Sequence, residues 1–108
     1  MPVTLCLPPR PGESLEQLMF LLSQRETVCA VPARHLVRCI EADPQDRSAL
    51  IVLVDAAVGT ARPVDVRFEL RALGDRPGVR SRSVGRAVWH GEDVEVYGTY
   101  LGPVSDEN

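Results

Sequence analysis

The sequence of 108 residues contains no lysine, because all twelve of its basic residues are arginine. Arginine keeps its charge at physiological pH and presents a planar fork of N–H donors that fits phosphate and carboxylate groups. Any anion site in this chain is therefore expected to be an arginine site. The net charge of −3 gives no whole-chain signal for a nucleic-acid or membrane binder.

Aromatic residues are scarce, at 5% of the sequence. Proteins that hold single-stranded nucleic acid stack successive bases on aromatic side chains along a basic groove. Trp89, Tyr97 and Tyr100 are too few and too scattered for such a platform. The sequence therefore argues against nucleic acid as a partner.

The cysteines lack a pairing pattern. Cys6, Cys29 and Cys39 are odd in number and form no C-x-x-C motif. The first seven residues have no basic region, so no signal peptide is expected. The longest apolar runs, such as residues 50–54, are far shorter than the roughly 18 residues of a membrane span. These features predict a cytoplasmic protein with reduced thiols.

The length allows one hydrophobic core, so residues 1–108 are expected to form a single domain. The hydrophobic fraction of 44% and the charged fraction of 25% are those of an ordinary globular protein. The polar residues 103–108 are expected to be a loose tail.

The segment that follows the turn-rich residues 8–12 has the marks of a helix. Ser14 reads as an N-cap, and Gln17 stands three residues on, as in a capping box. Apolar residues follow at i, i+3, i+4 and i+7, namely Leu15, Leu18, Met19 and Leu22. This spacing predicts one amphipathic helix over about residues 14–26, preceded by a short strand at residues 1–7.

From residue 27 onward the apolar pattern has a period of two. The clearest strand is residues 64–71, where Val64, Val66, Phe68 and Leu70 alternate with charged residues. Residues 48–54 contain an apolar run that predicts a central strand covered on both faces. Further strands are expected at residues 28–31, 36–41, 84–89 and 94–101, and the last two should form a hairpin.

Five or six strands at short spacing, without interleaved helices, favour a small antiparallel β-barrel over a parallel sheet. The predicted fold is therefore mainly β with one N-terminal helix, and the barrel spans about residues 27–102. We expect Trp89 to lie in the core, on the hairpin that closes the barrel.

Catalytic and metal-binding motifs are not recognisable. His35 and Cys39 have the most suggestive spacing, but on one strand they would lie roughly 13 Å apart, too far to share a metal ion. No serine stands in a G-x-S-x-G motif, and the carboxylates of residues 92–95 fall on an expected turn. The sequence therefore leans away from an enzyme and gives no cofactor, metal site or catalytic residue.

Charge is unevenly distributed along the chain. Residues 60–86 hold seven arginines and three acidic residues, a net of +4, which leaves −7 for the rest. An arginine-rich loop on an acidic domain could bind a phosphate ligand or a protein partner with an acidic surface. The residues of this possible interaction loop are Arg76, Arg80, Arg82 and Arg86. The alternative is that these charges only solvate a long loop.

Three features in order carry a family resemblance. The run from Arg34 to Arg38 is an R-x-x-x-R pair, Asp55 begins a segment directly after an apolar strand, and residues 85–89 and 96–102 form the last strand pair. Residues 34–102 thereby resemble a PilZ domain, a small β-barrel that commonly binds cyclic di-GMP.

That resemblance implies ligand contacts from three residues. Arg34 and Arg38 would bind phosphate or guanine, and Asp55 a guanine edge. Ala57 stands where the family has Ser, and Thr60 stands where it has Gly. These departures leave open whether any ligand is bound, and the domain could serve instead as a protein–protein adaptor.

A second resemblance competes with the first. Residues 82–91 contain Arg82, Arg86, Trp89, His90 and Gly91 in an arrangement similar to flavin-binding split barrels of the pyridoxamine-phosphate-oxidase kind. That family would imply FMN as the ligand. The main prediction is a regulatory, PilZ-like binding module, with the FMN-binding split barrel as the alternative.

Overall fold

Seven β-strands make up most of the described chain. The computed structural model describes residues 9, 11–12, 14–57, 63–75, 78 and 81–103, without the side chains of Arg47 and Pro103. The strands are β1 (Leu15–Leu22), β2 (Glu26–Pro32), β3 (His35–Asp43), β4 (Asp46–Ala57), β5 (Pro63–Ala72), β6 (Ser81–Trp89) and β7 (Glu92–Pro103). The expected strand at residues 1–7 and most of the expected tail lie outside the described residues.

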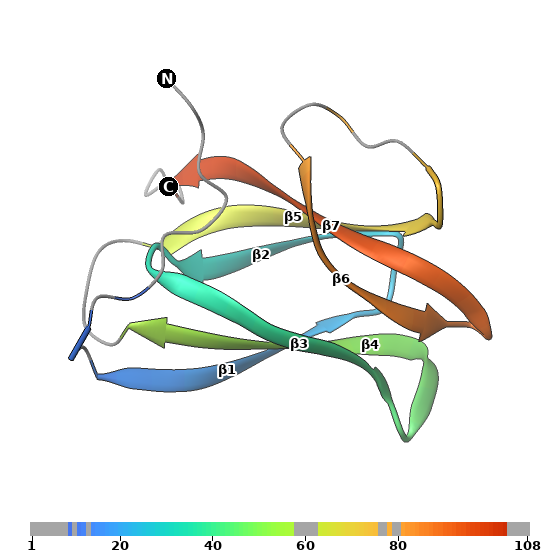
Figure 1. The fold of residues 1–108 in the computed structure, drawn as a ribbon, viewed down its shortest axis with the longest axis horizontal. Helices are drawn as coiled ribbons and strands as arrows, with labels where there is room; N and C mark the ends of the chain where they lie inside the picture. Colours follow the sequence, from blue (N-terminus) through green and yellow to red (C-terminus); the bar gives the residue numbers. More distant parts are fainter. Residues whose placement is uncertain are drawn as a thin grey trace, which may run out of the picture.

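The strands form two antiparallel sheets. One sheet has the order β1-β4-β3, and the other has the order β2-β5-β7-β6. Figure 1 shows the three-stranded sheet in the lower part of the molecule and the four-stranded sheet above it. The chain changes sheet after β1, after β2 and again after β4, so the fold is a β-sandwich.

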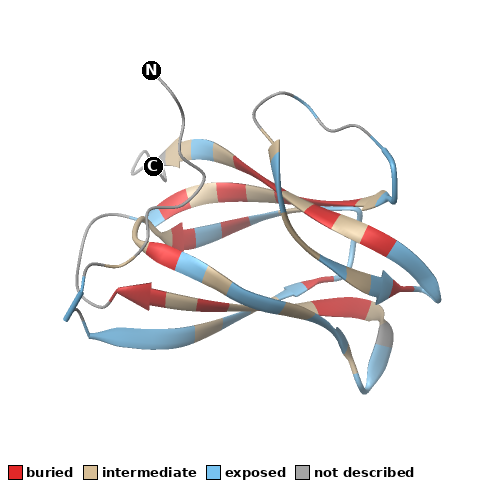
Figure 2. Cartoon of the chain, in the orientation of Figure 1, coloured by how far each residue is buried: buried red, intermediate tan, exposed pale blue. Residues whose placement is uncertain are grey.

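The core lies between the two sheets. In β4, Leu50, Val52 and Val54 are fully buried, whereas Ile51 and Leu53 are only half-buried. The facing sheet contributes Cys29, Val31, Val64, Val66, Phe68, Leu70, Val94 and Val96. This alternation of buried and more exposed residues is visible along β4, β5 and β7 in Figure 2. Each buried Val, Leu or Phe side chain stabilises the fold by about 1.5–3 kcal/mol.

The predicted helix over residues 14–26 is wrong, because this segment forms β1, the connection 23–25 and the start of β2. Six of the eight residues 15–22 are apolar, so the segment contains a set with a period of two as well as the set with a helical spacing. Leu18, Phe20 and Leu22 pack against the core, and the residues between them point outward. All eight residues of β1 pair with β4. Such tertiary pairing outweighs a local helix preference of a few tenths of a kcal/mol per residue.

The predicted barrel of five or six strands is also wrong, because the two sheets do not close into one. Links of three residues (23–25) and two residues (33–34) carry the chain across the core, so β1, β2 and β3 alternate between sheets. At one side β3 approaches β6, but these two strands are not neighbours in a sheet of the described chain. A barrel requires a hydrogen-bond ladder without a break.

The other strand predictions are confirmed. Strands β2 to β5 cover the segments expected at residues 28–31, 36–41, 48–54 and 64–71, and β6 and β7 form the expected hairpin. The apolar run does form the central strand of its sheet, β4, but only one of its faces is dry. Within the described part of the chain, no helix could span a membrane.

Candidate functional site

Arg38 and Asp55, two of the predicted ligand residues, form an ion pair with each other. The register of β3 against β4 shifts between Val37 and Cys39, so Arg38 sits at a bulge. Its Nε atom lies 3.3 Å from Oδ2 of Asp55, and the two side chains are 59% and 22% exposed. An ion pair this exposed is worth roughly 0–1 kcal/mol, so the Arg38 guanidinium can still exchange partners.

Arg34, the third predicted ligand residue, lies close to the same end of this sheet. Its carbonyl oxygen accepts a hydrogen bond from the backbone N–H of Ala57 across 3.0 Å. The connection between β2 and β3 therefore lies beside the last residue of β4, two positions beyond Asp55. Ala57 is itself a buried strand residue, and Thr60 lies outside the described residues.

His35 and Cys39 belong to opposite faces of β3. His35 is 1% exposed and faces the core, and its Nδ1 lies 2.7 Å from the carbonyl oxygen of Pro32. Burial lowers the pKa of His35, although the bond to Pro32 acts in the opposite direction. Cys39 is exposed. Nowhere in the described ranges do three His, Cys, Asp or Glu side chains gather closely enough to hold a metal ion.

The predicted interaction loop is described only at its end. Arg76 and Arg80 lie outside the described residues, whereas Arg82 and Arg86 are exposed residues of β6. The Nε atom of Arg86 lies 3.7 Å from Oε1 of Glu95, and the Arg86 side chain is 71% exposed. Glu95 also accepts a hydrogen bond of 2.6 Å from the Ser83 hydroxyl.

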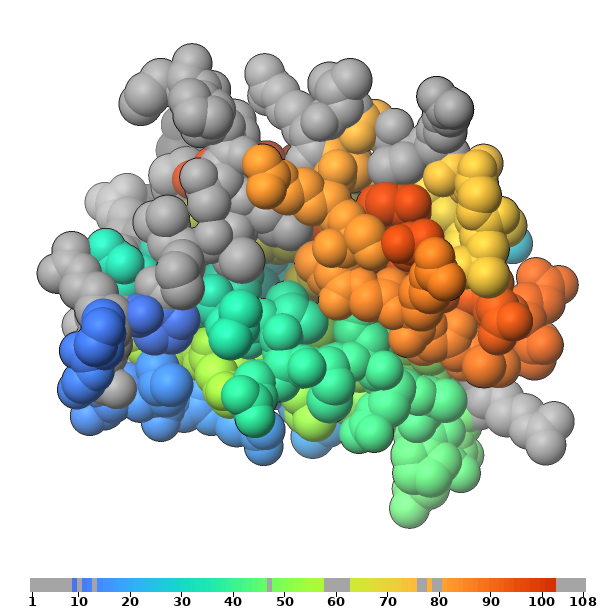
Figure 3. Space-filling view, in the orientation of Figure 1, coloured from blue at the N-terminus to red at the C-terminus, as the bar shows by residue number. Residues whose placement is uncertain are grey.

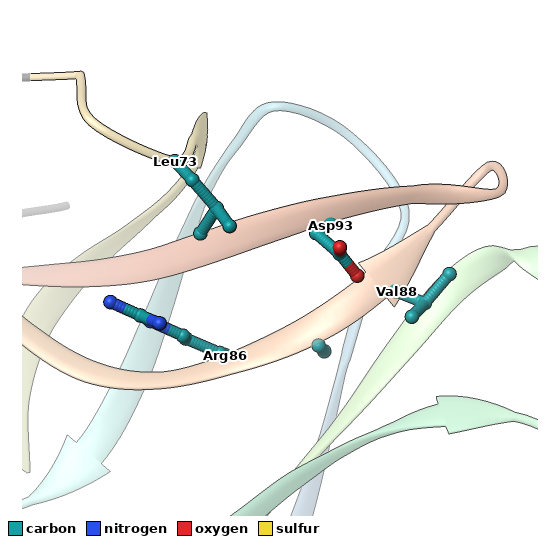
Figure 4. A pocket seen from close by; sticks show the side chains of 5 residues that line it. Leu73, Arg86, Val88 and Asp93 are labelled. Carbon is teal, nitrogen blue, oxygen red and sulfur yellow. The ribbon is translucent and has the colours of Figure 1, made fainter.

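A pocket of about 360 Å³ opens beside Arg86. Leu73 lines it from the turn directly after β5, Val88 from β6 and Asp93 from β7, and Ala87 completes it. Figure 4 shows these side chains around the outer surface of the β6–β7 hairpin. The pocket thus combines two aliphatic walls with one arginine and one carboxylate. Sequence reasoning missed it, because only the pairing of β5 with β7 brings residues 73 and 93 together.

Most other arginines on the four-stranded sheet are engaged with carboxylates. Glu69 lies between Arg67 and Arg71, and its Oε2 atom is 2.9 Å from Nη2 of Arg71. The hydrogen bond to Glu69 raises the pKa of the Arg71 guanidinium. Arg67 and Arg71 are also less exposed than Arg86, at 38% and 30% against 71%. Arg86 is therefore more available to an anion than Arg67 or Arg71.

The segment that resembles flavin-binding proteins does not present all of its residues on one surface. Arg82 and Arg86 are exposed, whereas Trp89 is buried, as expected for a core residue. The indole N–H of Trp89 donates a hydrogen bond to the Ser48 carbonyl, and the His90 ring packs edge-on against the indole. The Trp89 ring is thus engaged within the protein.

No family model matches this chain, and neither does any curated protein or solved structure. The geometry of the two arginine sites, at Arg38 and at Arg86, is therefore the basis for inferring a function.

Proposed function

We propose that this chain is a regulatory, non-catalytic interaction module of the cytosol that binds an acidic segment of a partner protein at the pocket beside Arg86, here called the β6 pocket. The observation that carries this proposal is the Arg86 side chain, which is 71% exposed and lines a pocket with aliphatic walls. A carboxylate of the partner would pair with Arg86, and an adjacent apolar side chain would enter between Leu73 and Val88.

The existing contacts of Arg86 favour exchange. Its ion pair with Glu95 is long, at 3.7 Å, and an exposed pair contributes little stability. Leu73 and Val88 are 45% and 48% exposed, so covering them removes apolar surface from water. Asp93 would repel a second carboxylate at the pocket, and this repulsion fixes the orientation of the bound segment.

The test uses a fluorescein-labelled peptide of alternating Glu and Leu, titrated with the protein and followed by fluorescence anisotropy. We expect saturable binding that Arg86→Ala weakens about tenfold, which corresponds to about 1.4 kcal/mol. Arg38→Ala is the matched control, since Arg38 is also an exposed arginine paired with one carboxylate, but on the other sheet. Equal losses in both variants, or no saturable binding, would reject the proposal.

A second candidate is a cyclic dinucleotide site at Arg34, Arg38 and Asp55, as the resemblance to PilZ domains implies. The observation in its favour is that Arg38 is 59% exposed and lies next to the Asp55 carboxylate. A phosphate could replace Asp55 as the partner of the Arg38 guanidinium. The released Asp55 carboxylate could then accept hydrogen bonds from a guanine edge.

Calorimetry with cyclic di-GMP tests this second site. Binding should be saturable, and Arg38→Ala should abolish it, whereas Arg86→Ala should leave it unchanged. The two arginine variants therefore serve as reciprocal controls for the two candidate sites. Absence of heat at high micromolar ligand would reject the dinucleotide site and leave the peptide site untouched.

A further inference from the structure

The two sheets have four edge strands, and three of them carry features that discourage pairing with another strand. β2 ends at Pro32. β3 has a register shift at Arg38, and β6 has one before Gly85 and carries Arg82 and Arg86. Bulges, prolines and charged side chains are the common means by which proteins protect sheet edges.

The fourth edge strand, β1, has neither a proline nor a bulge and carries a single charged side chain. Its sequence, LEQLMFLL, contains no proline, glycine, lysine or arginine, and Glu16 is its single charge. It pairs with β4 over eight residues without a register shift, so it is regular. Its other edge faces no strand of the described chain. Figure 1 shows β1 along the lower border of the molecule.

Three of the four outward side chains of β1 are apolar as well, and the fourth is Gln17. Leu15, Met19 and Leu21 are 49%, 62% and 57% exposed. Met19 and Leu21 stand opposite Leu53 and Ile51 of β4, so the apolar surface continues onto the next strand. Figure 3 shows the side chains of β1 next to those of β4 and β3 on this part of the surface.

We propose that two copies of this chain pair through their β1 edges, antiparallel, to form one continuous six-stranded sheet. This surface is separate from the β6 pocket, so the inference goes beyond the proposed function. A second copy is the partner because β1 is compatible with itself in sequence and in charge.

The compatibility follows from the geometry of an antiparallel pair. Opposite residues lie on the same face of a sheet, so a two-fold axis must pass through a residue position of β1. Centring the axis on Leu18 or on Met19 gives the two longest overlaps. In the register centred on Leu18, Leu15 faces Leu21 of the partner copy. In neither register does Glu16 face Glu16 of the partner copy. No like charges therefore oppose each other.

The proposed β1–β1 contact buries a small area, and this limits the expected affinity of the dimer. One strand edge and three half-exposed side chains fall short of the roughly 800 Å² per partner of a standard stable interface. The dimer should therefore be weak and its population should depend on concentration.

Sedimentation velocity of the full chain from roughly 1 µM to 1 mM, the range of weak interfaces, provides the test. We expect the sedimentation coefficient to rise with concentration. Met19→Glu and Met19→Lys should each be monomeric. In both registers residue 19 lies within two residue positions of residue 19 in the partner copy, so two like charges would stand close together. An equimolar mixture of the two variants should dimerise again, and this rescue requires that both variants are folded.

Val28→Glu is the matched control, since Val28 is 55% exposed on β2, the corresponding edge of the other sheet. It should dimerise like the unmodified chain. A chain that stays monomeric throughout the range, a Met19→Glu variant that still dimerises, or a mixture without rescue would each overturn the proposal. None of these outcomes bears on the Arg86 site, which the peptide titration tests separately.

Discussion

The indole N–H of Trp89 donates a hydrogen bond to the backbone carbonyl of Ser48 across 3.0 Å. Trp89 ends β6, and Ser48 lies near the start of β4, so this bond joins the two sheets directly. The guanidinium of Arg25, from the link between β1 and β2, stands 5.5 Å from the centre of the indole ring. Trp89 therefore ties three parts of the chain together at one end of the sandwich.

Trp89→Phe should lower the free energy of unfolding by about 2 kcal/mol, because the Ser48 carbonyl loses its donor and part of the core is emptied. Urea denaturation followed by circular dichroism measures the change. Tyr97→Phe is the control, since Tyr97 is a half-buried aromatic on the outer face of β7, and a change of less than about 0.5 kcal/mol is expected there. Equal effects would show that the bond to Ser48 contributes no specific stability.

Gly85 of β6 lies against the side chain of Ile40 from β3, across the two sheets. Its φ is +156°, and a Cβ at this position would lie 3.1 Å from Cδ1 of Ile40. Gly85→Ala should therefore lower the free energy of unfolding by about 1–3 kcal/mol, through backbone strain and crowding together. Thermal or urea unfolding measures the loss.

Two further variants separate the causes. Ile40→Val removes the Cδ1 methyl group, so adding it to Gly85→Ala should recover the part of the loss that comes from crowding. Gly78→Ala is the control, because a Cβ at Gly78 meets no atom within 4 Å. If the double variant is no more stable than the sum of the two single changes predicts, crowding against Ile40 is not the cause.

How much of this fold the sequence could predict depends on how ambiguous each pattern was. Residues 64–71 alternate strictly between apolar and charged, and such a segment fits only a strand with one dry face. Residues 15–22 are apolar at six of eight positions, so they fit a helix and a strand equally well. The choice was made by pairing with β4, more than 25 residues away, which no local pattern contains.

The two candidate sites also differ in how far the sequence could predict them. Arg34, Arg38 and Asp55 could be named in advance because a family resemblance pointed to them, and the register of β3 against β4 then brings Arg38 and Asp55 together. The pocket beside Arg86 could not be named. Leu73 and Asp93 meet there only because Ala72 pairs with Val94, and this register follows from tertiary structure.

The two described cysteines differ in environment, which predicts different reactivity. Cys29 is buried in the core, and burial raises the pKa of its thiol, whereas Cys39 is exposed on β3. Because the thiolate is the reactive form, iodoacetamide at pH 8 should alkylate Cys39 at least roughly tenfold faster than Cys29. Peptide mass spectrometry over a time course gives both rates. The two rates should converge in urea, and equal rates in buffer would mean that β2 opens readily from the sheet.

His35 predicts a pH dependence of stability. The imidazole is 1% exposed, and its Nδ1 donates to the Pro32 carbonyl, which leaves Nε2 unprotonated in the neutral ring. Burial lowers the pKa of His35 in the folded state, so the unfolded chain binds this proton more tightly. Stability should therefore be unaffected by His35 above the unfolded pKa of about 6.5 and should fall as the pH drops below it.

The measurement compares the unmodified chain with His35→Gln, by urea unfolding at intervals from pH 8 to pH 5. His35→Gln should be less stable at pH 8, because it alters a buried contact, but the difference between the two chains should shrink as the pH falls. Taking this difference removes the contributions of Asp and Glu, which both chains share. His90→Gln is the control, since His90 is an exposed turn residue. A constant difference between the unmodified chain and His35→Gln would mean that His35 binds its proton equally well in the folded and unfolded states.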